Sequence, residues 1–68
     1  MAMLKVIEVL AESEKSWEDA ARQAVAQASD SVRNVKSIYI KDFEATVDGN
    51  QVTRFRITAK ISFVLDGS

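Results

Sequence analysis

The last third of the chain alternates strictly between apolar and polar side chains, and this pattern constrains the fold more than any other. The apolar positions are Phe55, Ile57, Ala59, Ile61, Phe63 and Leu65. The positions between them are Arg54, Arg56, Thr58, Lys60, Ser62 and Val64. A period of two over this length predicts one long strand with a single buried face. That face needs a partner, and the rest of a 68-residue chain has little bulk with which to cover it.

Length and composition predict one small domain, residues 1–68, that gains stability by association. The chain has 0 Cys and 0 His, which excludes a disulfide framework and the usual zinc or haem ligands. A single core of this size rarely supplies more than about 3–5 kcal/mol, so the remaining common remedy is oligomerisation.

The charges exclude some functions and indicate how two strands pair. The net charge is -1 and the charged residues are interspersed, without the basic stripe that nucleic-acid binding needs. Arg54, Arg56 and Lys60 share one strand face, where we expect them to pair with Asp42 and Glu44. No apolar run approaches the roughly 20 residues of a membrane-spanning helix, and no signal-peptide pattern opens the chain, so we expect a cytoplasmic protein.

A helix is predicted in the first half of the chain. Residues 4–10 are rich in β-branched side chains and predict a short strand, and residues 11–15 a polar hinge. Ser16 followed by Asp19 resembles a capping box and marks the start of the helix, and Asn34 is a plausible end. The apolar stripe of this helix consists of Trp17, Ala20, Ala21, Ala24, Val25, Ala28 and Val32. Because alanine dominates the stripe, the helix can lie close to a sheet, which must supply the large core side chains.

Residues 35–47 predict a second long strand, whose two faces both carry apolar residues. One parity holds Val35, Tyr39, Phe43 and Val47, and the other holds Ile38, Ile40, Asp42 and Glu44. Either a bulge switches the faces, or the strand is buried on both sides. The sequence Asp48-Gly49-Asn50 predicts a hairpin turn into the third strand.

The predicted order β-α-β-β corresponds to an α+β fold, with one helix laid on a three-stranded antiparallel sheet. The other face of the sheet is left uncovered, and we expect it to carry Ile38, Ile40, Arg56 and Lys60. An uncovered mixed face with open strand edges predicts self-association.

Four segments together resemble the dodecin family over nearly the whole chain. They are Lys5-Val6-Ile7-Glu8-Val9, Ser16-Trp17-Glu18-Asp19-Ala20-Ala21, Ser31-Val32-Arg33-Asn34-Val35 and Ala59-Lys60-Ile61-Ser62-Phe63. The resemblance implies the β-α-β-β fold and a hollow homododecamer of cubic symmetry. It also implies storage of a flavin such as riboflavin or FMN between subunits, without catalytic turnover.

The resemblance also identifies candidate site residues. Flavin-binding dodecins have a tryptophan that stacks on the flavin where this chain has Ser37, and a glutamine that binds the ring edge where it has Arg56. Asp42 corresponds to an acidic residue near the flavin ribityl chain. Tyr39 lies two residues after Ser37 on the same strand face, where it is either a stacking platform or a core or interface residue. We assign Trp17, in the first helical turn, to packing.

Two kinds of ligand follow from these residues. The first is a flavin or another flat anionic metabolite, bound at Ser37, Tyr39, Asp42 and Arg56, with the Arg56 guanidinium as an anion contact. Substitution of the stacking tryptophan and the glutamine makes this a degenerate flavin site.

The second kind is calcium or a small anion, held between the subunits of a dodecin-like shell without flavin. The calcium ligands would come from Asp42, Glu44, Asp48 or Asp66. Calcium takes six to eight oxygen ligands and the chain has no EF-hand spacing, so such a site would be built between subunits.

The sequence argues against an enzyme. It has no His or Cys to act as a base or nucleophile, no Gly-rich phosphate loop and no nucleophile-elbow serine. Asp42 and Glu44 share a strand face, but beside Arg56 they are expected to form ion pairs and not an acid–base couple.

Overall fold

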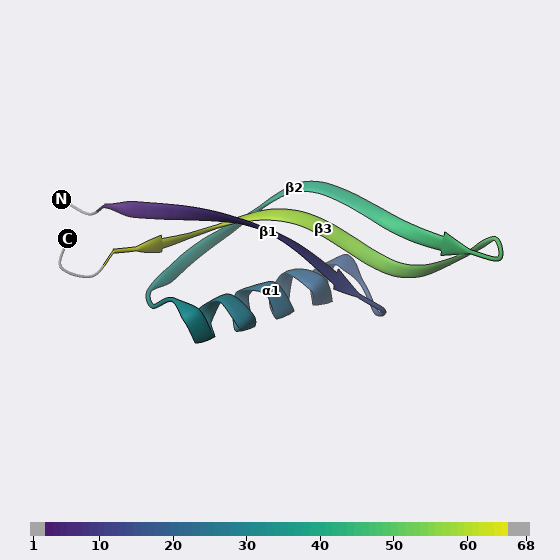
Figure 1. Cartoon of the computed structure of the whole chain (residues 1–68), viewed down its shortest axis with the longest axis horizontal. Coiled ribbons are helices and arrows are strands. Elements are labelled where there is room, and N and C mark those ends of the chain that lie inside the picture. The colour runs from purple at the N-terminus through teal and green to yellow at the C-terminus, as the bar shows by residue number, and fades with distance from the viewer. Residues whose placement is uncertain (1–2, 66–68) are drawn as a thin grey trace.

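The computed structural model describes residues 3–65, and in these residues the predicted α+β fold is confirmed. The elements are β1 (Leu4–Ser13), α1 (Trp17–Ser31), β2 (Val35–Asp48) and β3 (Gln51–Val64). The strands form one antiparallel sheet in the order β1-β3-β2, and α1 lies against one face of it (Figure 1). None of the described residues form a helix long and apolar enough to cross a membrane.

The core is small and lies between α1 and the central strand β3. Its buried apolar residues are Ala20, Ala24, Ile57, Ala59, Ile61 and Phe63. Ile57 and Ile61 are the largest fully buried side chains. Both belong to the alternating apolar set of β3 that the sequence predicts to be buried. Only alanines of α1 are fully enclosed, so the helix approaches the sheet closely while β3 supplies the bulk.

Ser16 begins the helix, as the sequence predicts, but the capping box is only half formed. The Ser16 side chain accepts a hydrogen bond from the Asp19 main-chain N–H at 2.9 Å. The Asp19 carboxylate instead accepts from the Ser13 hydroxyl at 2.6 Å and from Gln23 Nε2 at 2.6 Å. Ser13 is buried and also accepts from the Lys15 main-chain N–H at 2.9 Å. Ser13 therefore joins the end of β1 to the first turn of α1.

Two element boundaries differ from the prediction. β1 continues three residues beyond the expected end at Leu10, because its pairing with β3 extends to Ser13 opposite Phe55. Val32 is extended (φ -131°, ψ 154°) and caps the helix, although the stripe placed it inside. Asn34 has φ 62°, a left-handed conformation that reverses the chain where the sequence predicts the helix to end.

Bulges in β2 explain why both of its parities carry apolar residues. Ile40 lies opposite Ala59 and Asp42 lies opposite the next residue of β3, Thr58, so Lys41 is an extra residue. Ile38 and Ile40 consequently pack against the core beneath the helix. The prediction that Ile38 and Ile40 lie on the uncovered face is therefore wrong. Even-numbered residues of β2 before the bulge face the helix, whereas Asp42 and Glu44 after it face away from the helix.

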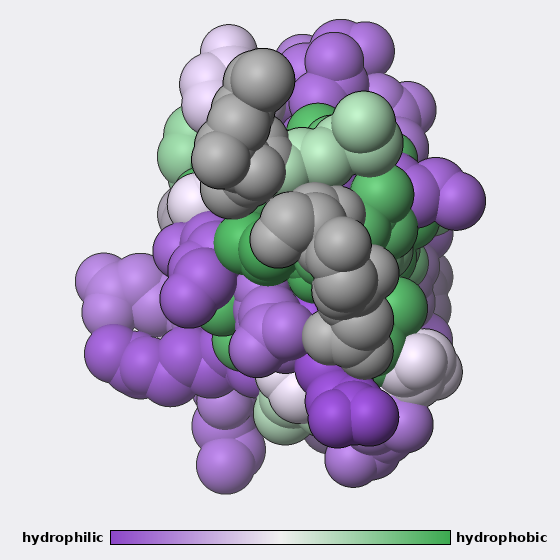
Figure 2. Space-filling view, turned by 90° about the vertical axis from the view of Figure 1, so that its left-hand side faces the viewer, coloured by the Kyte–Doolittle hydropathy of each residue, from purple (hydrophilic) through white to green (hydrophobic). Residues whose placement is uncertain are grey.

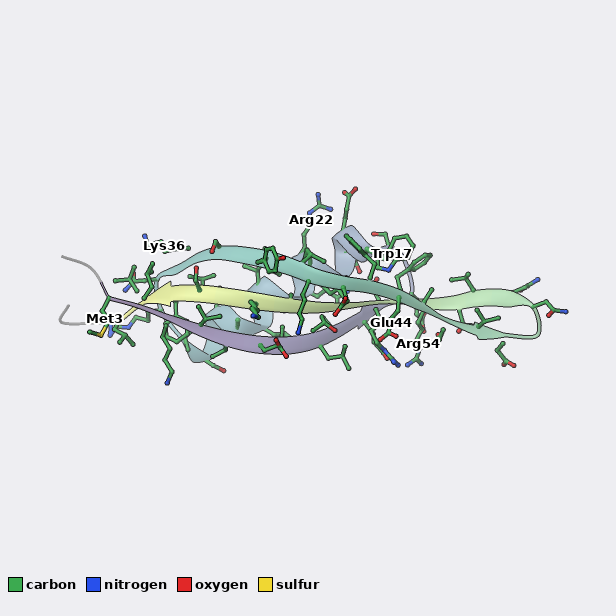
Figure 3. The ribbon with its side chains drawn as sticks, turned by 90° about the horizontal axis from the view of Figure 1, so that it is seen from above. Met3, Trp17, Arg22, Lys36, Glu44 and Arg54 are labelled. Atoms are coloured by element: carbon green, nitrogen blue, oxygen red, sulfur yellow. The ribbon has the colours of Figure 1, made fainter. Side chains whose placement is uncertain are left out.

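We call the sheet face opposite α1 the open face, and Figure 3 looks onto it. Register places on it Leu4, Val6, Glu8, Leu10 and Glu12 of β1, Ser37, Tyr39, Asp42 and Glu44 of β2, and Arg54, Arg56, Thr58, Lys60, Ser62 and Val64 of β3. Viewed from the end where β1 begins, hydrophobic residues run through the middle of the molecule and hydrophilic ones surround them (Figure 2).

The far ends of β2 and β3 form a hairpin that extends past the helix (Figure 1). We call residues 46–53 the hairpin arm. Gly49 (φ 58°) and Asn50 (φ 66°) occupy its turn, between Asp48 and its partner Gln51, which confirms the predicted hairpin. The arm gives the chain an elongated shape of 51 × 19 × 13 Å.

Candidate functional site

The predicted site residues all lie on the open face, in two neighbouring strands. Ser37, Tyr39, Asp42 and Glu44 of β2 lie opposite Ser62, Lys60, Thr58 and Arg56 of β3, respectively. The structure therefore brings the candidate residues to one surface, although they are spread along it and do not converge on one point.

Ser37 is held by a neighbour across the sheet. Its hydroxyl shares a hydrogen bond with the Ser62 hydroxyl, and both side chains are short and outside the core. This pair presents no flat apolar surface. The position therefore has no platform on which an aromatic ligand could stack.

Tyr39 is the aromatic residue of β2 on the open face. Its side chain is 63% exposed and lies opposite Lys60, so Tyr39 is outside the core of the single chain. Of the alternatives left open by the sequence, an interface position and a stacking platform remain.

Arg56 is the centre of an ion-pair network that joins all three strands. Its Nε donates to Glu12 Oε1 of β1 at 2.7 Å, and its Nη2 contacts the same oxygen. Its Nη1 lies 3.5 Å from Glu44 Oε1 of β2. Arg54 also reaches Glu12, with 3.3 Å between Nη1 and Oε2. The guanidinium of Arg56 is thus engaged within the chain and is poorly placed to receive an external anion.

The sequence predicted Glu44 as a partner of Arg56 and missed Glu12. Glu12 falls in the segment interpreted as a hinge, whereas the structure places it in β1 directly opposite Arg56. Extending the antiparallel pairing of β1 and β3 by two residues would have found it. The hydrogen bond from Arg56, with a second from Arg54, lowers the pKa of Glu12 below its ordinary value, and the same contact raises the pKa of Arg56.

Asp42 is an acidic residue of the open face that has no ion pair within the described residues, so its expected pairing with the basic residues of β3 is wrong. It is exposed and lies opposite Thr58, two register pairs from Glu44. Residues 3–65 contain no group of three or more acids arranged to hold a metal. Asp48 lies at the tip of the hairpin arm, and Asp66 is outside the described residues. A calcium site at Asp42 and Glu44 would therefore need oxygens from other copies.

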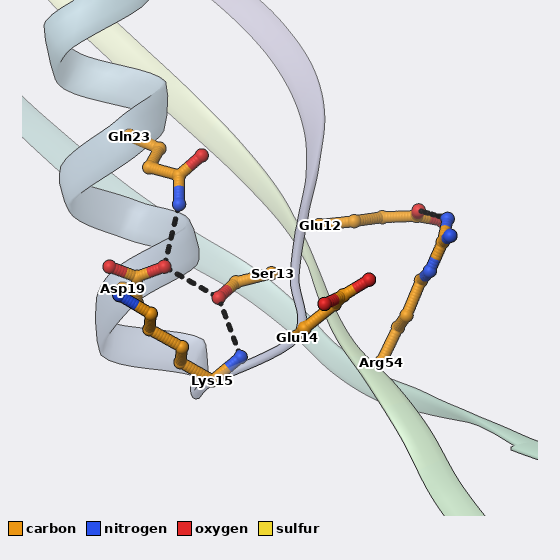
Figure 4. Close-up of a pocket in the computed structure, with 7 residues that line it drawn as sticks. All are labelled: Glu12, Ser13, Glu14, Lys15, Asp19, Gln23 and Arg54. Carbon is orange, nitrogen blue, oxygen red and sulfur yellow. Dashed lines mark hydrogen bonds and ion pairs between the residues drawn. The ribbon is translucent and has the colours of Figure 1, made fainter.

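A cleft of about 390 Å³ lies beside the start of α1, and Figure 4 shows it. Its lining residues are Glu12, Ser13, Glu14, Lys15, Asp19, Gln23 and Arg54. The Ser13–Asp19–Gln23 hydrogen bonds and the Glu12–Arg54 ion pair cross it, so these groups are already used. The hydrogen bond from Ser13 lowers the pKa of the Asp19 carboxyl below its ordinary value. We interpret the cleft as the joint between β1 and α1.

Trp17 packs as the sequence predicts, and it also makes a polar contact that the sequence did not indicate. Its ring meets Phe43 edge-on at 5.9 Å and Phe55 at 4.9 Å between centroids. Its indole N–H donates to the Glu44 main-chain carbonyl at 2.9 Å. The first residue of α1 is therefore bonded to the strand segment that carries the candidate acids.

The Glu12–Arg56 ion pair predicts a dependence of stability on pH. Because folding lowers the pKa of Glu12, its contribution is present above the ordinary glutamate pKa of about 4.3 and is lost as the pH falls through the lower folded value. We expect Glu12→Gln to have a lower thermal midpoint than the unaltered protein at pH 7, and this difference to shrink towards pH 3. Glu18→Gln, which removes an exposed pair with Arg22, is the control with little effect at either pH. A constant difference between pH 7 and pH 3 would contradict this assignment.

Comparison with known proteins gives a consistent result. The sequence model of the dodecin family matches residues 3–66. The calcium dodecin of Mycobacterium tuberculosis is 35% identical over 63 residues, covering 93% of this chain and 89% of that protein. Its crystal structure, described as calcium chelating with a novel calcium-binding site, has a TM-score of 0.82 at 33% identity, covering 97% of this chain and 94% of the other. The dodecin of Streptomyces coelicolor has a TM-score of 0.92 at 25% identity, covering 98% and 96%.

Proposed function

The chain belongs to the dodecin family, and from this premise we propose that it is a homododecameric shell that binds calcium between its subunits. Dodecins are binding and storage proteins, so the proposed activity is sequestration of a ligand without turnover. The open face is the surface on which we place both the subunit contacts and the ligand.

The exposed apolar residues of the open face support self-association. Leu4, Val6 and Leu10 of β1 are 56%, 56% and 61% exposed, and Tyr39 of β2 is 63% exposed. Both β1 and β2 are edge strands with unpaired outer sides. A single chain would leave this surface in water, whereas contact with other copies removes it.

Asp42 is the observation that carries the choice of calcium. It is a site carboxylate on the open face that no cation of the described residues neutralises. Symmetry in an assembly repeats one residue around an axis, so several copies of Asp42 and Glu44 can supply oxygens that one chain lacks. The relative from M. tuberculosis is named for calcium, which agrees with this choice.

The residues present do not fit a flavin in the way of flavin-binding dodecins. Ser37 is bonded to Ser62 and provides no platform, and Arg56 is committed to Glu12 and Glu44. Tyr39 is the exposed ring nearest to this position in the strand. Binding of riboflavin is therefore the alternative outcome of the test and not the conclusion.

Isothermal titration of the EDTA-treated oligomer with calcium chloride tests the proposal. We expect saturable binding by a species whose native mass is about twelve times the 7.5 kDa chain. Asp42→Asn should weaken binding by about tenfold or more, because the site loses a negative charge in every copy. Asp48→Asn is the matched control, since it removes the same charge from the hairpin tip and should bind calcium as the unaltered protein does.

The proposal fails if the unaltered oligomer takes up no calcium, or if Asp48→Asn weakens binding as much as Asp42→Asn. Saturable quenching of riboflavin fluorescence by the unaltered protein would instead assign it to the flavin-storing dodecins. A stable monomer would remove the basis for any site between subunits.

A further inference from the structure

We infer that Trp17 is a positioning residue for Glu44: by holding the Glu44 main chain, its indole N–H sets the direction of the Glu44 carboxylate on the open face. Trp17 belongs to α1, so it contacts β2 from the face of the sheet opposite the candidate site. It rests on the proposed function only in its consequence for calcium.

The geometry joins Trp17 to β2 by two independent kinds of contact. The indole N–H donates to the Glu44 carbonyl oxygen at 2.9 Å. The ring packs edge-on against Phe43 of β2 at 5.9 Å and Phe55 of β3 at 4.9 Å, so two strands fix its orientation. Figure 3 shows Trp17 and Glu44 together at the end of the helix from which the hairpin arm departs.

This segment of β2 needs a positioning contact more than the central strand does. β2 is an edge strand, paired with β3 on one side only. Its register shifts between Ile40 and Asp42, and again between Thr46 and Val47, so Glu44 lies in a short stretch bounded by irregularities. A bulged edge strand has fewer restraints on its main chain, and the indole supplies one from outside the sheet.

The Glu44 carboxylate lies on the other side of the strand from the indole and meets Arg56 there. Glu44 Oε1 is 3.5 Å from Arg56 Nη1, while Glu12 holds the same guanidinium from β1. Of the two ion pairs of Arg56, the one with Glu44 involves a residue bonded to Trp17, and the one with Glu12 does not. The two ion pairs therefore provide an internal comparison, because a change at Trp17 should affect the pair with Glu44 and leave the pair with Glu12 unaltered.

A double-mutant cycle on the metal-free protein tests the inference. Trp17→Phe keeps a ring beside Phe43 and Phe55 but removes the N–H donor. We expect Glu44→Gln to lower the thermal midpoint at least twice as much in the unaltered protein as in Trp17→Phe, at equal protein concentration. Glu12→Gln should lower the midpoint equally in both backgrounds.

A second experiment measures the consequence for calcium binding. If the proposed calcium site includes Glu44, Trp17→Phe should raise the dissociation constant for calcium by about fivefold or more in oligomers of unaltered native mass. Phe43→Leu is the matched control, since it removes a ring contact of Trp17 and retains the indole hydrogen bond, and it should bind calcium with nearly the original affinity.

The outcomes separate the inference from the proposed function. The positioning role is overturned, whatever the ligand, if Glu44→Gln lowers the thermal midpoint equally in the unaltered protein and in Trp17→Phe. It is also overturned if Trp17→Phe reduces the effects of Glu12→Gln and Glu44→Gln on the midpoint to the same extent. An unaltered protein that takes up no calcium would refute the proposed function, and the metal-free cycle would still decide the role of Trp17. If calcium binds and Trp17→Phe weakens it no more than Phe43→Leu, Trp17 does not position Glu44 for calcium.

Discussion

The protein carrying Ser37→Trp and Arg56→Gln is expected to quench riboflavin fluorescence with micromolar or tighter affinity, whereas the unaltered protein should not quench it at these concentrations. Register places residue 37 on the open face, so a tryptophan there would project its indole onto the surface that Ser37 now leaves bare. Stacking on an aromatic side chain is worth about 1–3 kcal/mol per ring, and in the proposed assembly a neighbouring copy would bury the second side of the ligand.

The second substitution serves a different purpose. Arg56 is held by Glu12 and Glu44, and glutamine replaces this fixed charge by a neutral amide that both donates and accepts hydrogen bonds. The single variants are the controls, and we expect Ser37→Trp alone to gain part of the affinity and Arg56→Gln alone to gain none. Absence of quenching by the double variant would show that residues 37 and 56 do not border one pocket in the assembly.

Replacing Ile57 by alanine should cost about 2–5 kcal/mol of unfolding free energy, because the change empties space in the centre of the core. Ile57 is fully buried and packs with Ala20 and Ala59. Because these neighbours are small, they cannot fill the space that the lost side chain would leave. A core of this size rarely supplies more than about 3–5 kcal/mol, so Ile57→Ala should lose most of the stability that the single chain derives from its core. Denaturation by urea, followed by circular dichroism, measures the loss.

Ile57→Val is the graded control and should cost about 0.5–1.5 kcal/mol, since it removes one methylene and keeps the branch. Equal losses in the two variants would mean that helix and sheet collapse onto the gap. A loss below about 1 kcal/mol in Ile57→Ala would contradict the assignment of Ile57 to the core.

The fold could be predicted because its main signals are local. The alternation of residues 54–65 specified β3, and Ser16 with Asp19 specified the start of α1. The Asp48-Gly49-Asn50 turn likewise needs only adjacent residues to adopt positive φ. In each case the physical cause lies within a few residues of its effect, so a single sequence contains it.

The errors arise where residues far apart in the sequence decide the outcome. Ile38 and Ile40 were expected on the uncovered face because the extra residue Lys41 is visible only in the pairing with β3. Glu12 was missed as the partner of Arg56 for the same reason, since 44 positions separate them. The contact between the Trp17 indole and a main-chain carbonyl of β2 has no sequence signal at all, because any residue at position 44 carries that carbonyl. Whether Asp42 and Arg56 meet a ligand depends in addition on other copies of the chain.

The hairpin arm leaves part of the newly synthesised single chain without buried contacts. The radius of gyration is 13.9 Å, whereas a compact chain of this length would have about 11 Å. Val47 and Val52 of the arm are 65% and 55% exposed, and no helix covers them. On the proposed assembly, a newly made chain can complete the core under α1 by itself but can bury the arm only after it meets other copies. Assembly is then the last step of folding, and its rate depends on how many copies have already been made.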